Sequence, residues 1–149
     1  MDDSDQTSAI GLFNFAHSYA ASAMQLAKCQ PAGTTHPEAV VDFLAFHAIE
    51  LYFKAFVRAK GLTVAEMKLL GHRLDKLHNK ASELGLAVED RNGVILLATY
   101  SMMDRRYIRT GWTQRHPHEL VFEVCRSLHE SVGEALRSLG LATTLPRLT

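Results

Sequence analysis

The chain has 149 residues, of which 47% are hydrophobic and 21% are charged, and its basic and acidic side chains are equal in number. This length and composition are typical of one soluble globular domain. A net charge of zero argues against a protein that coats nucleic acid through a general excess of positive charge, and the hydrophobic content argues against disorder. Composition therefore predicts a compact domain and assigns it no function.

Helical periodicity predominates along the chain, and the alternation typical of strands is almost absent. We expect an amphipathic helix over 9–29 and a second helix over 35–60. Thr35 and Glu38 have the spacing of a capping box at the start of the second helix. This helix is apolar almost all round, which predicts that it lies at the centre of the domain.

Four further segments show the helical pattern. Thr63 and Glu66 have capping-box spacing before a short apolar run, which predicts a short helix. Glycines that follow three of the expected helices are typical helix stops. The expected helices of this half of the chain span 63–70, 73–84, 91–106 and 117–139.

Together these patterns predict an all-α fold, a single-domain antiparallel up-and-down bundle of about five helices. We expect the helical domain to span 9–140, between a flexible N-terminus at 1–8 and a loose C-terminal tail at 141–149.

The sequence also bears on location and cofactors. The acidic N-terminal residues lack the basic and apolar regions of a signal peptide, and no apolar stretch is long enough to span a membrane. We therefore expect a cytoplasmic protein without a membrane partner. No His, Cys or carboxylate spacing fits a metal site, and no glycine-rich phosphate loop is present, so we expect neither a metal nor another cofactor.

The most unusual segment is the basic stretch at 105–118, which holds four Arg, two His, a Tyr and the only Trp. Arginine matches the geometry of a phosphate, and aromatic rings can stack on a base. The alternative is that these arginines stabilise a helix C-terminus, or that they and the Trp form a protein interface. The candidate nucleotide or phosphate contacts are Arg105, Arg106, Tyr107, Arg109 and Trp112.

One narrow polar stripe interrupts the second helix, at His47, Glu50, Lys54 and Arg58. At 100° per residue these side chains fall within about 80° of arc. We favour a solvated or dimer-facing edge, on which Glu50 and Lys54 form an ion pair. The functional alternative is a polar cleft that faces the basic stretch, in which His47, Glu50 and Lys54 contact a nucleotide.

Three segments together resemble HEPN domains, the higher eukaryote and prokaryote nucleotide-binding family. The run His-Ala-Ile-Glu-Leu-Tyr-Phe-Lys-Ala-Phe at 47–56 is similar to the family's central helix, and Gly-His-Arg-Leu at 71–74 is similar to its Gly-His-Asp-Leu turn. Arg-Tyr-Ile at 106–108 resembles its Arg-Tyr-Pro segment. The resemblance implies an up-and-down helical bundle that commonly forms homodimers.

The resemblance also implies two different functions, because some HEPN proteins are metal-independent ribonucleases and others are inactive binding modules. The ribonucleases carry an Arg followed by a His after four to six residues. Arg109 and His116 have this spacing, and so do Arg73 and His78, but chance alone produces such pairs in a chain with this many Arg and His residues.

We expect first a non-catalytic module that binds a nucleotide, RNA or a partner protein such as a nucleotidyltransferase. The alternative is a toxin-like endoribonuclease that uses Arg109 and His116 as catalytic residues and is neutralised by an antitoxin partner. In that reaction the His would move a proton and the Arg would hold the phosphate. A purely structural dimerisation domain is the third possibility.

Overall fold

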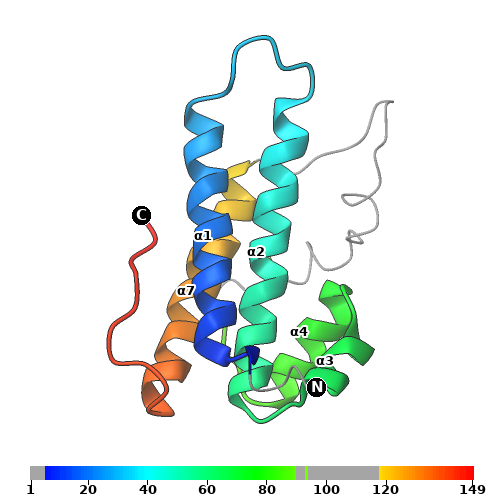
Figure 1. Ribbon diagram of the computed structural model, residues 1–149, viewed down its shortest axis with the longest axis vertical. Coiled ribbons are helices and arrows are strands. Elements are labelled where there is room, and N and C mark those ends of the chain that lie inside the picture. The colour runs from blue at the N-terminus through cyan, green and yellow to red at the C-terminus, as the bar shows by residue number, and fades with distance from the viewer. Residues whose placement is uncertain (1–5, 90–92, 94–117) are drawn as a thin grey trace.

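The computed structural model describes residues 6–89, 93 and 118–149. Over these residues the chain contains five helices and no strand, and the helices pack against one another in a single bundle (Figure 1). The predicted all-α bundle is therefore confirmed, although the helix expected over 91–106 falls almost wholly outside the described residues. The helices are α1 (Ala9–Lys28), α2 (Pro37–Ala59), α3 (Val64–Leu70), α4 (Leu74–Glu83) and α7 (His118–Ser138).

The central position predicted for α2 is also confirmed. It runs antiparallel to α1, α7 lies against both, and α3 and α4 pack beside one end of it (Figure 1). The alanines of α1 at positions 16, 20 and 23 are fully buried, which lets the two long helices approach closely. Phe13 anchors this contact, with its ring 5.5 Å from that of Tyr52 in an edge-to-face arrangement.

The two predicted capping boxes have different outcomes. Thr63 and Glu66 form the predicted capping box at α3. The box predicted from Thr35 is wrong, because α2 begins with Pro37 in its first turn and His36 becomes the N-cap. The Thr35 hydroxyl is therefore one residue too early to cap the helix and contacts Nδ1 of His36 instead.

The segment before α1 is fixed where the structure describes it. The Ser8 hydroxyl accepts a hydrogen bond from the backbone of Gly11, which caps α1. Arg58 at the end of α2 donates to the carbonyl oxygens of Thr7 and Leu62. Thr7 and Ser8 are thus part of the folded domain and not of a flexible terminus.

The C-terminal tail at 141–149 is packed against the bundle, although we expected it to be loose. Leu145 is 9% exposed, and its Cδ1 lies 3.2 Å from the position that a Cβ on Gly133 would take. The His17 ring donates from Nε2 to the carbonyl oxygen of Arg147, and His129 donates from Nε2 to that of Pro146, both at 2.8 Å. Gly133 of α7 leaves space for Leu145, and the rings of His17 and His129 hold the backbone of the tail.

None of the described helices is long and apolar enough to cross a membrane.

Candidate functional site

The middle of α2 brings three of the predicted site residues together with a fourth from the turn between α3 and α4. The carboxylate of Glu50 lies at the centre. Lys54 Nζ is 2.7 Å and His72 Nδ1 is 2.6 Å from its Oε1, and His47 Nδ1 is 3.8 Å from its Oε2. We call these four residues the Glu50 cluster.

The burial of Glu50 corrects the interpretation of the polar stripe as a solvated edge. Its side chain is 1% exposed, whereas those of Lys54, His47 and His72 are 16%, 25% and 51% exposed. The predicted ion pair between Glu50 and Lys54 is confirmed. The cluster is therefore a buried carboxylate whose three partners are partly exposed at the surface.

The local sequence explains how the cluster forms. His47, Glu50 and Lys54 stand three and four residues apart, so they share one face of α2. Gly71 ends α3 with φ 63° and ψ −133°, a backbone conformation that residues other than glycine rarely adopt. This turn reverses the chain and places His72 against α2.

Electrostatics keep Glu50 ionised. Burial alone raises the pKa of this carboxyl, but the interactions with His47, Lys54 and His72 outweigh burial and lower the pKa from 4.5 to about 2. Lys54 supplies the balancing positive charge. Oε1 takes both short contacts, while Oε2 has no hydrogen-bond donor within the described part of the chain, since His47 stands beyond hydrogen-bonding distance.

Aromatic rings adjoin the cluster on the His47 side. The ring of Tyr19 meets that of His47 edge-on at 4.6 Å, and the ring of Phe43 is stacked with it at 6.2 Å. Phe43 is 44% exposed, so part of its ring is open to solvent. The site thus combines a buried acceptor, a cation and an accessible aromatic face.

The remaining predicted residues have different outcomes. Arg58, the fourth member of the stripe, donates to the backbone carbonyls of Thr7 and Leu62 and so ties the N-terminal segment to the end of α2. The basic-stretch candidates and the predicted catalytic pair lie outside the described residues: Arg105, Arg106, Tyr107, Arg109, Trp112 and His116.

The second Arg–His pair is described, and it does not form a site. Arg73 is exposed and binds both carboxylate oxygens of Asp75. His78 is 7% exposed and packs edge-on against the ring of Phe53 at 5.9 Å. His78 is thus an almost fully buried residue of the core.

Sequence reasoning missed two further polar pairs. Asp42 on α2 is 2% exposed and lies 3.4 Å from Nε2 of His118, at the start of α7. The Tyr52 hydroxyl donates to Nδ1 of His129, whose other nitrogen holds the tail. The interruption of an apolar run by Asp42 was the only available signal, because each partner comes from a distant segment.

No three His, Cys, Asp or Glu side chains are placed to hold a metal ion in the parts of the chain that the structure describes. Comparison of the chain with protein-family models, curated proteins and solved structures gave no match. The resemblance to HEPN domains therefore rests on the three segments at 47–56, 71–74 and 106–108 alone.

Proposed function

We propose that the chain is a HEPN-like, non-catalytic binding module whose ligand is a nucleotide or a short stretch of RNA. The ligand binds at the Glu50 cluster and at the aromatic face formed by Phe43 and His47. The observation that carries the proposal is the buried Oε2 of Glu50, which has no hydrogen-bond donor among the described residues.

An unsatisfied buried oxygen is costly, typically by about 1–3 kcal/mol, and native proteins keep few of them. A ligand that brings an N–H or O–H group removes this cost on binding. Bases carry amino and imino groups and ribose carries hydroxyls, so a nucleotide offers several suitable donors. Lys54 neutralises the carboxylate, and the site therefore does not repel the phosphate of such a ligand.

The aromatic face supplies the second half of the argument. Stacking of a base on an aromatic side chain is worth about 1–3 kcal/mol and tolerates any base. Phe43 is exposed and its ring is stacked with that of His47, which in turn adjoins Glu50. A base that stacks on Phe43 therefore lies beside His47, which adjoins the carboxylate.

The basic stretch would contribute phosphate contacts from its arginines in this proposal. Because the whole chain is neutral, few phosphates would be contacted, and affinity for RNA should fall only modestly as salt rises. A homodimer and a nucleotidyltransferase partner remain expectations of the resemblance.

The proposal is tested by titrating the full-length protein with AMP and with a fluorescein-labelled 12-nucleotide single-stranded RNA. The decisive variant is Phe43→Ser, which should weaken binding about tenfold through lost stacking. Val40→Ser is the matched control, because Val40 is also apolar, 52% exposed and on the same helix. Equal losses in both variants, or no binding by the folded wild type, would refute the proposal.

The non-catalytic part of the proposal has its own test. The same RNA is incubated with the wild type in the presence of a chelator and is expected to remain intact. Cleavage that disappears in His116→Ala would instead establish the metal-independent ribonuclease.

A further inference from the structure

A groove of about 700 Å³ lies between α7 and the C-terminal tail, on a part of the surface that the proposed function does not use. Its floor includes His129, which is fixed by hydrogen bonds to Tyr52 and Pro146. Because two histidines and Leu145 hold the tail in place, both walls of the groove are preformed.

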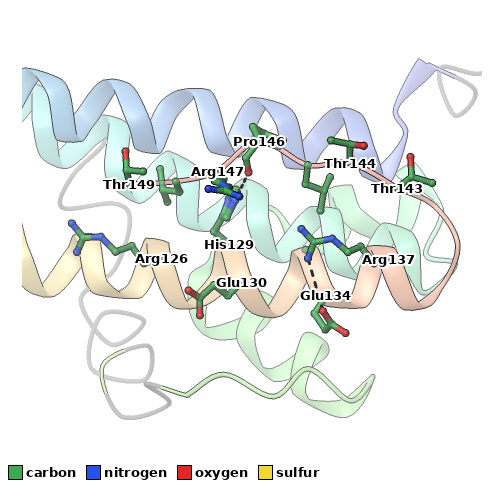
Figure 2. Close-up of a pocket in the computed structure, with 13 residues that line it drawn as sticks. Arg126, His129, Glu130, Glu134, Arg137, Thr143, Thr144, Pro146, Arg147 and Thr149 are labelled. Atoms are coloured by element: carbon green, nitrogen blue, oxygen red, sulfur yellow. Dashed lines mark hydrogen bonds and ion pairs between the residues drawn. The ribbon is translucent and has the colours of Figure 1, made fainter.

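Positive side chains predominate in this groove. Arg126 and Arg137 enter it from α7 and Arg147 enters it from the tail, whereas the carboxylates of Glu130 and Glu134 point to the side of α7 away from the tail (Figure 2). Three arginines thus line the length of this cavity, and its two acids are turned outward.

The existing ion pairs leave these guanidinium groups able to bind more. Arg147 has no carboxylate partner within the described residues, and Arg137 has only a long contact of 3.9 Å with Glu134. Arg126 contacts two carboxylates through the same nitrogen, Glu123 at 2.5 Å and Glu119 at 3.7 Å, but a guanidinium has five N–H groups, and those on its other nitrogens remain available. Exposed pairs of this kind contribute roughly 1 kcal/mol or less, so an incoming anion can compete for the arginines.

The tail adds neutral donors to the charged ones. Its extended backbone forms no helix or sheet, and in residues 143–149 no N–H donates to a protein group within the described part of the chain. The hydroxyls of Thr143 and Thr144 also line the groove. Guanidinium, hydroxyl and backbone N–H groups are the donors that bind phosphate in proteins.

The spacing of the arginines determines the shape of the ligand. Arg126 and Arg137 stand eleven positions apart on α7, which places their backbones about 16 Å apart. One phosphate cannot reach both, whereas a row of phosphoryl groups can, with Arg147 between the ends. We propose that this groove binds a linear ligand with two or more phosphoryl groups, supplied either by a free polyphosphate or by the backbone of a nucleic acid.

The test is isothermal titration of the full-length protein with inorganic tripolyphosphate in a phosphate-free buffer. Arg137→Ala and Arg147→Ala should each weaken binding roughly tenfold, since each removes charge-assisted hydrogen bonds. Glu134→Gln should strengthen it. Arg73→Ala is the control, because Arg73 is also an exposed arginine but lies in the turn before α4, away from the groove. Circular dichroism confirms that each variant is folded.

Two results would overturn the proposal: no binding of tripolyphosphate by the folded wild type, or the same affinity in Arg147→Ala and Arg73→Ala. Phe43→Ser should leave tripolyphosphate binding unchanged, which separates this groove from the Glu50 cluster. Competition by the 12-nucleotide RNA identifies nucleic acid as the source of the phosphoryl groups. Failure to compete identifies a free polyphosphate.

Discussion

Replacing Glu50 by Gln should destabilise the domain by an amount that depends on pH in a calculable way. The pKa of this carboxyl falls from 4.5 in the unfolded chain to about 2 in the folded one, and each pKa unit corresponds to about 1.4 kcal/mol. The ionised carboxylate therefore contributes roughly 3 kcal/mol to the free energy of unfolding at pH 7. Removal of one partner from a buried ion pair typically costs 3–5 kcal/mol, and partial exposure of Lys54 and His72 places this case at the lower end.

The sign of the pH dependence follows from the lowered pKa. The contribution of Glu50 is complete above pH 4.5 and is lost as the pH falls towards 2, because the unfolded state then binds a proton that the folded state does not. At pH 3 about 2 kcal/mol of it should already be lost. The difference between wild type and Glu50→Gln should thus shrink from roughly 3 kcal/mol at pH 7 to about 1 kcal/mol at pH 3.

Urea unfolding followed by circular dichroism measures both values. Glu83→Gln is the control, because Glu83 is 68% exposed and makes only a 3.5 Å contact with Lys80. Its effect should stay within about 0.5 kcal/mol at either pH. If the difference for Glu50→Gln is the same at pH 7 and pH 3, the carboxylate is not held ionised by its partners and the reasoning fails.

Three further predictions concern the turn at Gly71, the C-terminal tail, and His129 of α7, which binds that tail. Gly71→Ala forces a side chain into a strained backbone conformation, at a cost of about 1–3 kcal/mol in urea unfolding, and by moving His72 it should also weaken nucleotide binding. The control Gly33→Ala, with φ 78° in the loop before α2, should lose stability without losing affinity. Leu145→Ala should cost on the order of 2 kcal/mol and make the tail sensitive to proteolysis; an unchanged digestion pattern would show that the leucine does not anchor it. Burial is the main cause that lowers the pKa of His129, so its stabilising contribution is present above the ordinary pKa of 6.5 and is lost as the pH falls below it. An NMR titration of the ring should give a midpoint below 6.5, and a midpoint above that value would contradict the burial argument.

The fold could be predicted from the sequence because its determinants are local. The capping box at Thr63 and the glycines at 61, 71 and 85, all with positive φ, fix where helices end through residues adjacent in the chain. The apolar circumference of α2 likewise indicates burial on every side without any knowledge of its neighbours. At Thr35 the same spacing was misleading, because Pro37 begins the helix, with His36 as the N-cap, two residues later than expected.

The candidate site could be predicted only in part, because its geometry depends on segments distant in sequence. The positions of His47, Glu50 and Lys54 on one face follow from helical spacing. The burial of Glu50 does not, since His72 arrives from a turn 22 residues further along the chain. The packing of the tail was missed for the same reason. It depends on the absence of a side chain at Gly133 and on two histidines, His17 and His129, from different helices.

The energetics of the Glu50 cluster suggest why a binding role suits it better than a structural one. Apolar side chains of similar volume usually match or exceed the stability that a buried ion pair provides, because the desolvation of two charges offsets their attraction. Most of the buried residues of α2 follow that rule and are apolar, and Asp42 is the other exception. Glu50 departs from it, and its Oε2 has no hydrogen-bond donor among the residues that the structure describes, so an apolar side chain would stabilise this position at least as well. A ligand that completes the hydrogen bonds of the carboxylate gives the departure a physical reason.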